Sequence, residues 1–500
     1  MTRVNWLRIA GALVIATAAI LRLYRLDLKP LHHDEGVNGY FLLKLIRERA
    51  YIYDPANYHG PTLYYFGLIT CGYMNVLFGK AGISAIALRL GPAIFGIATV
   101  WIVLLLRGLS GNTATGVAAA LLTVSPGAVY FSRYFIHEAM FAFFTVAAVA
   151  AASRYSESGR SKYLMYASAS AALLVGTKET AVIAVAVLIL AAIGTRIVVK
   201  YREGSASPTM AIAIRKLLRP AVLASAVLFL VIVTILYSAF LLNFPQGIYD
   251  VLGTLRFWTA TAAIAHKQPW YTYLHWLWQE EKPLLVPALA GLILIAWRGE
   301  RFQTFCALWA VGMIAAYSCI PYKAPWLTLN MLAPLALTAG AGFQIAYASI
   351  GRYSRGLLAL LAIVALAIAL QRSVKLNFYE YDNEERAYVY AHTQRAFLTL
   401  IQEIERMGDS RGGRNAVTIT VASPEYWPMP WYLRDFPKTG YPGRLDEPAQ
   451  TDMIIVSHKQ QAQAKTFIGA DYEYVSTYAL RPGVDLLLFV RKLPALPIRQ

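Results

Sequence analysis

Acidic and basic side chains interrupt the sequence at the ends of long apolar runs, where ionisable groups are costly and often functional. The first such stretch, LHHDEGVNGY, contains Asp34 and Glu35 at the start of a predicted amphipathic surface helix. A carboxylate in this place could act as a general base. Acids at a helix N-terminus are also ordinary partners of the helix dipole, so two interpretations of the pair stay open.

Two further stretches combine acids with cations. SRYFIHEAM contains Arg133, His137 and Glu138, which is more charge than a short connection between two helices needs. GTKET contains Lys178 beside Glu179, and these two side chains could simply neutralise one another. Each stretch therefore admits both a functional and a structural interpretation.

The last two stretches contribute isolated polar residues. The aromatic segment 261–278 contains His266, and PYKAPW places Lys323 between two prolines. Together the stretches supply acids, histidines and isolated cations at one membrane boundary. This combination suits a reaction with an anionic leaving group, in which a carboxylate acts as the base and the cations hold a phosphate.

The elements that must position these residues are membrane helices. Hydrophobic residues make up 57% of the 500-residue chain, and its mean hydropathy is +0.47. Soluble domains have a lower apolar content, and several apolar runs are long enough to cross a bilayer. The last part of the chain is instead charged, aromatic and rich in turns. We therefore predict a transmembrane domain over 1–377 and a small soluble domain over 378–500.

Hydropathy predicts eleven membrane spans. A further apolar piece at 61–79, within the first loop at 25–88, is rich in Gly and Tyr. We predict that it forms a helix lying in or dipping into the interface without crossing. The predicted spans are 6–24, 89–106, 113–131, 135–153, 163–177, 179–197, 220–242, 283–297, 302–319, 326–349 and 356–371.

The net charge of +18 comes largely from Lys and Arg residues that flank the apolar runs. If 61–79 does not cross, most of them fall in cytoplasmic loops, as the positive-inside rule requires. This places the N-terminus in the cytoplasm and the C-terminal domain outside, in a multi-pass protein of the plasma membrane. The pattern also argues against nucleic acid as a partner. The cysteines form neither a metal-binding spacing nor a disulfide framework, since Cys71, Cys306 and Cys319 all lie in apolar segments.

The C-terminal domain has the pattern of a small α/β unit, in which a helix is followed by short strands. No glycine-rich phosphate loop opens any of its predicted helices, so we expect no nucleotide site there. Its aromatic segment SPEYWPMPWYLRDF, at 423–436, could pack onto the membrane domain or form a platform for a sugar or lipid. The predicted elements are a helix at 384–407 and strands at 417–422, 453–457, 472–480 and 485–492.

Several motifs resemble those of a known superfamily and occur in its order. Asp34 and Glu35 follow the first span, and Asp-Pro and His-Gly-Pro follow in the same loop. Arg89 then opens the second span, and Ser-Arg-x-x-x-x-Glu follows the third. The chain resembles the glycosyltransferase C superfamily, in particular the dolichyl-phosphate-mannose protein mannosyltransferases and the bacterial lipid A aminoarabinose transferases. HHDEGVNGY, DPANYHGP and YWPMPWYLRD look most like a flippase-activity-associated family of archaea and bacteria.

This resemblance implies a polytopic helical membrane fold and a function. The donor would be a polyprenyl-phosphate-linked sugar, the acceptor a lipid, glycan or protein, and the transfer would take place outside the cytoplasm with inversion. Inversion needs one base and no covalent intermediate. The catalytic acids would be Asp34, with Glu35 beside it, and Glu138. The arginine that opens the second span in the superfamily matches Arg89, and we predict that the donor phosphate is bound by Arg89, Arg133, Lys323 and Lys178.

A divalent metal is a further hypothesis. His59 and His266 could share an ion with an acid such as Glu138, because imidazole and carboxylate suit Zn²⁺. The aminoarabinose branch has Glu-Lys where this chain has His59-Gly60, which removes a cation expected near the lipid phosphate. Unpaired interfacial histidines are also common without a metal.

Two other classes of protein remain as alternatives. A flippase or flippase partner would bind a lipid-linked glycan without transferring its sugar, and a membrane sensor would use the outer domain for binding. A transporter is expected to show repeated halves with interrupted helices near the midplane. The sequence shows no such repeat, and its polar clusters lie at one boundary, which favours the enzyme.

Overall fold

The computed structural model describes residues 3–49, 51–56, 59–203, 219–262 and 267–492. The chain forms two compact units, each described here by itself. The first consists of Met1–Leu26, Leu45–Tyr381 and Arg386–Tyr388, and the second of Asp27–Lys44, Asp382–Glu385 and Val389–Gln500. The segment that carries Asp34 and Glu35 thus belongs to the same unit as the C-terminal domain.

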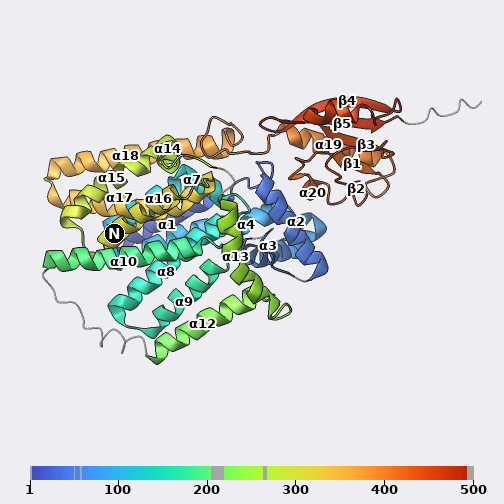
Figure 1. The fold of residues 1–500 in the computed structure, drawn as a ribbon. Coiled ribbons are helices and arrows are strands. Elements are labelled where there is room, and N and C mark those ends of the chain that lie inside the picture. The colour runs from blue at the N-terminus through green and yellow to red at the C-terminus, as the bar shows by residue number, and fades with distance from the viewer. Residues whose placement is uncertain (1–2, 50, 57–58, 204–218, 263–266, 493–500) are drawn as a thin grey trace, which may run out of the picture. The chain divides into compact units, whose positions relative to one another are not determined.

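Long apolar helices make up the first unit (Figure 1). Among the described residues, eight helices are long and apolar enough to cross a membrane, and one bent pair would make a ninth. The pair is α6 (Asn112–Val124) and α7 (Pro126–Ser132), which meet at 59°. The eight are α1 (Arg3–Leu23), α4 (Ala85–Leu105), α8 (Glu138–Ser158), α10 (Ala181–Glu203), α12 (Pro220–Tyr237), α16 (Arg301–Cys319), α17 (Leu329–Ser349) and α18 (Arg352–Val374).

The predicted polytopic helical fold is confirmed, and each predicted span coincides with a helix or with the bent pair. That all eleven predicted spans cross the membrane stays a prediction. Two of these helices are shorter than the spans above: α9 (Ser161–Val175) has 15 residues and α15 (Lys282–Arg298) has 17. The span predicted at 113–131 is broken at Ser125, whose side chain caps α7 by accepting from the amide of Ala128. Pro126 follows as the first residue of α7, where it needs no amide partner.

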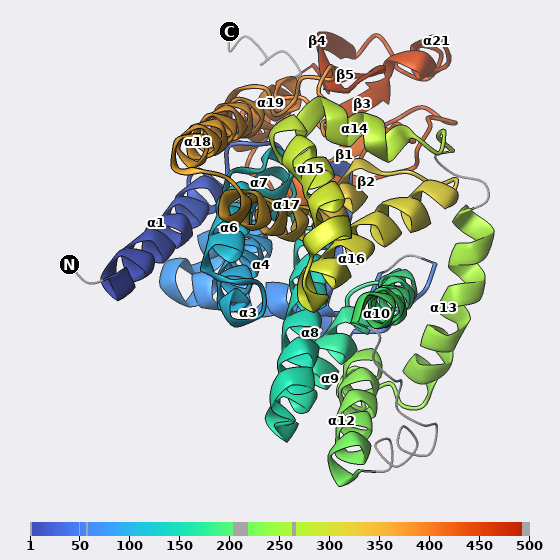
Figure 2. The ribbon, with the colours of Figure 1, turned by 90° about the vertical axis from the view of Figure 1, so that its left-hand side faces the viewer.

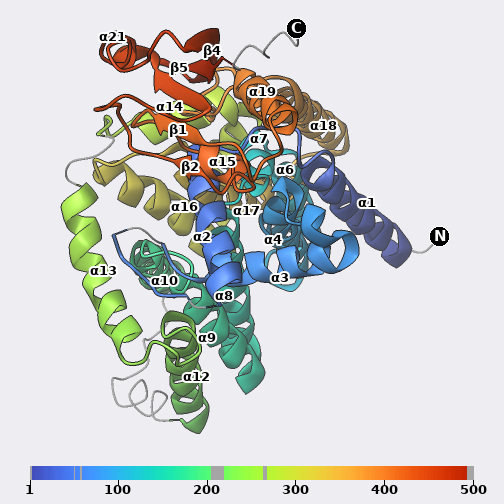
Figure 3. The ribbon, with the colours of Figure 1, turned by 90° about the vertical axis from the view of Figure 1, so that its right-hand side faces the viewer.

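Within this bundle α17 is the central helix and packs against α6, α15 and α16 (Figures 2 and 3). It is the most buried span, whereas α12 and α18 present most of their surface outward. In Figure 1, α17 and α18 run in nearly the same direction, whereas α13 (Gln246–Ala262) runs at a steep angle to them. The piece predicted to lie in the interface forms α3 (Thr62–Phe78), which packs on α4. The short helices α5 (Arg107–Ser110) and α14 (Thr272–Glu280) complete the unit.

The second unit contains a mixed five-stranded sheet in the order β2-β1-β3-β5-β4. Strand β1 pairs in parallel with β2 and β3, and β5 pairs antiparallel with β3 and β4. The α/β domain predicted from the sequence is therefore confirmed. Its elements are α19 (Ala396–Ser410), β1 (Ile419–Ala422), α20 (Met429–Tyr432), β2 (Thr439–Gly440), β3 (Met453–Ser457), α21 (Gln461–Ala464), β4 (Tyr472–Arg481) and β5 (Val484–Arg491).

The helix predicted from residue 384 begins only at Ala396. The preceding residues have other partners: the amide of Gln394 donates to the Leu480 carbonyl at 2.9 Å, at the end of β4. Arg395 pairs with Asp382 at 2.5 Å. These tertiary bonds replace the i to i−4 bonds of a longer helix. From Phe397 onward the apolar residues recur at helical spacing, and this face packs onto the sheet.

Candidate active site

A buried ion pair joins two of the stretches that the sequence singled out. Glu138 opens α8, and Lys178 lies in the turn between α9 and α10. Lys178 Nζ lies 2.6 Å from Glu138 Oε1, and both side chains are almost fully buried. Burial lowers the pKa of Lys178, but the Glu138 and Glu179 carboxylates outweigh burial and raise it above its ordinary value. The lysine is therefore a fixed positive charge.

A second pair lies directly beside the first. His59 Nδ1 lies 3.0 Å from Glu179 Oε2, and the ring of His59 meets the ring of His137 edge-on at 5.2 Å. Burial raises the pKa of Glu179, but His59 and Lys178 outweigh burial and lower it. Burial, together with His59 and Lys178, lowers the pKa of His137. His137 is therefore neutral, and its Nε2 bonds the Gly60 carbonyl at 3.0 Å.

The backbone at Gly60 explains how this cluster is assembled. The Gly60 amide donates to the Thr177 carbonyl and the Thr62 amide to the Gly176 carbonyl, each at 3.1 Å. A Cβ atom added at Gly60 would lie 2.2 Å from the Gly176 carbonyl oxygen. Only glycine fits here, so the loop of His59 and the turn of Lys178 can run side by side.

Arg89 and Arg133 both hold the turn that follows α1. The Arg89 guanidinium donates to the Leu26 carbonyl at 2.7 Å. The Arg133 guanidinium donates to carbonyls of this turn, including Tyr24 at 2.7 Å and Arg25 at 2.8 Å. Both side chains are buried. The structure thus brings these two cations to one turn and gives each a backbone partner.

Lys323 lies at the end of α16, where its Nζ donates to the carbonyls of Tyr317 at 3.1 Å and Ser318 at 3.0 Å. The ring of Tyr273 lies 5.4 Å away. The four cations predicted to bind phosphate therefore contact three groups of atoms: the turn after α1, the acid Glu138, and the end of α16. Their binding of a common phosphate stays a prediction.

The acids of the first loop open helix α2 (His33–Glu48) in the second unit. His32 caps this helix: its Nδ1 accepts from the Asp34 amide at 3.1 Å, and its own amide donates to Glu35 Oε2 at 3.0 Å. This reciprocal pattern resembles a capping box, with histidine in the place of serine and with the Asp34 amide in the place of the N3 amide. Glu35 is buried in that role, whereas Asp34 is partly exposed and its carboxylate has no hydrogen bond or ion pair among the described residues. His266 lies outside the described residues.

Comparisons with known proteins identify the fold. A family model described as dolichyl-phosphate-mannose-protein mannosyltransferase matches residues 69–214. The structure of ArnT from Cupriavidus metallidurans bound to undecaprenyl phosphate superposes with a TM-score of 0.70 at 13% identity, covering 97% of this chain and 98% of that one. The chain has the glycosyltransferase C fold.

A second solved structure supports this assignment of the glycosyltransferase C fold. Archaeal oligosaccharyltransferase AglB from Archaeoglobus fulgidus, in complex with an inhibitory peptide and a dolichol-phosphate, superposes with a TM-score of 0.53 at 13% identity. The match covers 99% of this chain and 75% of that one. No curated protein sequence matches the chain.

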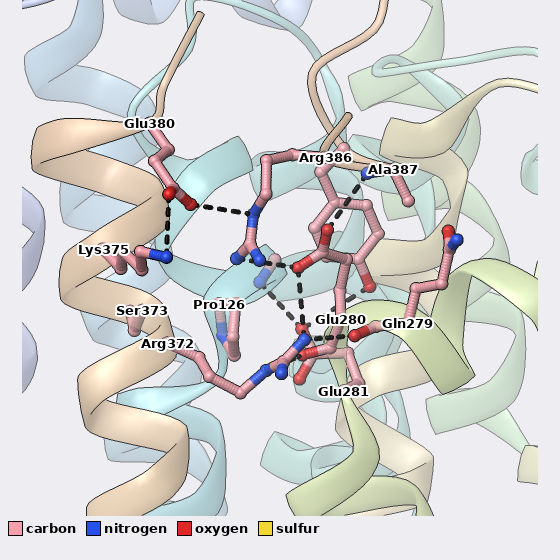
Figure 4. A network of polar contacts seen from close by, with 12 residues as sticks. Pro126, Gln279, Glu280, Glu281, Arg372, Ser373, Lys375, Glu380, Arg386 and Ala387 are labelled. Carbon is pink, nitrogen blue, oxygen red and sulfur yellow. Dashed lines mark hydrogen bonds and ion pairs between the residues drawn. The ribbon is translucent and has the colours of Figure 1, made fainter. Parts of the chain in front are cut away.

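Two acids that the sequence interpretation missed anchor this glycosyltransferase C bundle (Figure 4). Glu280 bonds the Ala387 amide at 3.0 Å and pairs with Arg386 at 2.9 Å. Glu281 Oε1 accepts a hydrogen bond from the Ser125 hydroxyl at 2.9 Å and another from the Gly127 amide at 2.7 Å, both at the start of α7. Burial raises the pKa of Glu281 to about 8. The sequence signal that could have found them is the pair of adjacent acids directly before a predicted span.

The donor set for a metal is incomplete in the described chain. His59 and Glu179 offer two adjacent donors, but no group of three or more His, Cys, Asp or Glu residues gathers among the described residues. Glu138, the expected third ligand, already binds Lys178. Zinc takes at least three protein ligands even in its open catalytic sites. The described residues alone therefore supply two adjacent donors, while His266 lies outside them, and no chemical step below uses a metal.

Proposed function

We propose that this multi-pass membrane protein is an inverting glycosyltransferase that moves a sugar from a polyprenyl-phosphate donor to an acceptor on the outer face of the membrane. Three observations support the donor class: the family model, and the ArnT and AglB structures, which hold undecaprenyl phosphate and dolichol-phosphate. The observation that carries the catalytic assignment is Asp34, whose carboxylate has no hydrogen bond or ion pair among the described residues. The adjacent Glu35 is buried and accepts from the His32 amide.

Asp34 would act as the general base. An acceptor hydroxyl is a poor nucleophile at neutral pH, so it needs a carboxylate that takes its proton during attack. The hydroxyl oxygen forms a bond to C1 of the sugar while the bond from C1 to the phosphate oxygen breaks. The electron pair of that bond leaves with the polyprenyl phosphate, and the proton goes to Asp34. One base suffices for inversion.

The cations would stabilise the departing phosphate. Negative charge grows on the phosphate oxygen as its bond to C1 breaks, and fixed positive charges lower that barrier. Lys178 is held in place by Glu138, and Arg89 and Arg133 are held by backbone carbonyls. In this proposal Glu138 acts through Lys178, by keeping its ammonium charged and oriented. Lys323 is the remaining candidate for a phosphate contact.

A transfer assay tests this proposal. The purified protein is reconstituted in liposomes with a panel of polyprenyl-phosphate hexoses, and release of polyprenyl phosphate is followed by mass spectrometry, together with lipids that co-purify with the protein. We expect a bound polyprenyl phosphate and its release with an inverted product. Bound phospholipid alone, with no release from any donor, would contradict the proposal and favour a binding protein.

We also propose that the C-terminal domain lies outside the plasma membrane. Positive residues gather in the loops that this orientation places in the cytoplasm. Single cysteines at positions 440 and 351, in a chain without its native cysteines, can be labelled by an impermeant reagent in intact cells. Labelling at 440 with protection at 351 is expected, and the reverse pattern would invert the topology.

A further inference from the structure

We infer that the C-terminal domain positions the proposed base, and that the contact between Gly36 and Pro428 fixes the helix that carries Asp34. The inference rests on the proposed function, because it concerns the base of that reaction. All residues involved belong to the second compact unit. Gly36 and Pro428 are positioning residues, since neither side chain could itself take a proton.

The backbones of α2 and of the loop after β1 approach very closely at this point. A Cβ atom added at Gly36 would lie 2.4 Å from Pro428 Cβ and 2.6 Å from Pro428 Cα. Both atoms belong to a rigid proline, so the contact cannot relax by turning a flexible side chain. Any larger residue at position 36 must push the helix away from the domain.

Aromatic rings flank this contact along one face of α2. His33 lies three residues before Gly36 and Tyr40 four residues after it, so all three share a helix face. Trp427 meets the ring of His33 edge-on at 6.4 Å and the ring of Tyr40 edge-on at 5.8 Å. The aromatic segment therefore packs against α2 within its own unit.

The residues just before the acid are also tied to the domain. The Leu31 amide donates to the Tyr432 hydroxyl at 2.8 Å, and His32 Nε2 bonds the Tyr390 carbonyl at 3.0 Å. Arg481, on β4, donates to His33 Nδ1 at 3.1 Å. Burial lowers the pKa of His33 to about 4, so its ring is neutral and can accept this bond.

These contacts leave Asp34 on a different face. Neighbouring residues on a helix point about 100° apart. The helix face that carries His33 packs against Trp427 and Pro428, so the Asp34 carboxylate points away from that contact. A base must lie within hydrogen-bond reach of the proton it takes. A shift of about 1 Å, even one caused far from the reaction, can cost about 10²-fold in rate.

The test replaces Gly36 by alanine and compares it with Gly469→Ala, a position in the same unit whose added Cβ would meet nothing within 4 Å. Alanine favours helices more than glycine does, so G36A does not weaken α2 itself. We expect G36A to lower the turnover number about 10²-fold, with polyprenyl-phosphate binding and melting temperature kept and faster hydrogen exchange in α2. G469A should behave as wild type.

A milder pair of variants covers the case in which G36A fails to fold. Tyr432→Phe removes the acceptor of the Leu31 amide, and Tyr474→Phe removes a hydroxyl that bonds Thr477 at 2.8 Å on the exposed side of β4. We expect Y432F to lower turnover at unchanged donor affinity, by less than G36A, and Y474F to leave it unchanged.

The outcomes separate this inference from the proposed function. Wild-type turnover in G36A or Y432F, with α2 loosened by hydrogen exchange, would overturn the positioning role even if Asp34 is the base. Loss of donor binding in parallel with turnover would also overturn it, because the defect would then be general. Full activity of Asp34→Asn would instead refute the proposal that Asp34 is the base. Hydrogen exchange in α2 would then still show whether Gly36 and Pro428 fix this helix.

Discussion

Glu138 and Asp34 are both acids at the end of an apolar segment, yet their surroundings are opposite. Glu138 is buried in the first unit and bound to Lys178 at 2.6 Å, whereas Asp34 is partly exposed in the second unit with no ion pair among the described residues. In the proposal above, this difference favours Glu138 as the group that holds a charge in place and Asp34 as the group that accepts a proton.

The largest expected effect comes from breaking the buried pair. Lys178→Met leaves the Glu138 carboxylate buried without its cation, and such a loss costs about 3–5 kcal/mol of folding stability. We expect a large fall in the melting temperature of the detergent-solubilised protein. The double variant Lys178→Met with Glu138→Gln should recover much of that loss while remaining inactive. Equal instability of the single and double variants would show that the pair is not coupled.

A pH-dependent effect is expected at Glu281, which is buried like Glu138 but pairs with no lysine among the described residues. Its pKa of about 8 lies above the ordinary value of 4.5, so the folded protein keeps a proton that the unfolded chain has released. The contribution of Glu281 to the free energy of unfolding is therefore largest below pH 4.5 and is lost as the pH rises toward 8. Glu280 and Arg372 are the charged neighbours that contribute to this pKa.

The check is the melting temperature of Glu281→Gln between pH 5.5 and 8.5. Glutamine keeps an acceptor for Ser125 and cannot ionise, so the wild type should lose more thermal stability over this range than the variant does. The exposed acid Glu157 supplies the control, since Glu157→Gln should follow the wild-type curve. Parallel curves for wild type and Glu281→Gln would place the Glu281 pKa near its ordinary value.

The smallest expected effect concerns Glu35, the neighbour of the proposed base. Glu35→Ala removes the acceptor of the His32 amide, and losing a helix cap costs about 1 kcal/mol. Glu35→Gln keeps an acceptor there, so its stability and turnover should stay close to wild type. Turnover measured for both variants would sharpen the comparison. A Glu35→Gln variant as inactive as Asp34→Asn would mean that the two acids share one role.

Local patterns account for the parts of the fold that the sequence predicted. Apolar length placed a helix or the bent pair at every predicted span, and a short apolar run placed β3 (Met453–Ser457) where the structure has it. The break at Ser125 was missed because hydropathy averages over a Ser-Pro pair. The late start of α19 was missed because the residues just before it, Gln394 and Arg395, are tied instead to the end of β4 and to Asp382, which are tertiary contacts.

The candidate site was predictable in its residues and less so in its pairings. Sequence alone left Lys178 and Glu179 free to neutralise one another, but the structure pairs Lys178 with Glu138 and Glu179 with His59. These partners come from segments far apart in the chain, and no spacing rule joins them. The close approach of Gly36 to Pro428 was equally unpredictable, since no pattern in either segment indicates that the two meet.

The most direct test of the central claim compares Asp34→Asn with Glu138→Gln in the same transfer assay. Asparagine keeps the size of the side chain but removes the base, so Asp34→Asn should lower turnover by about 10²-fold or more while polyprenyl-phosphate binding and melting temperature are kept. Glu138→Gln should instead lose stability together with activity, because it leaves Lys178 buried without its acid. Near wild-type transfer by Asp34→Asn, with a stable and inactive Glu138→Gln, would show that Glu138 is the base and would contradict the account.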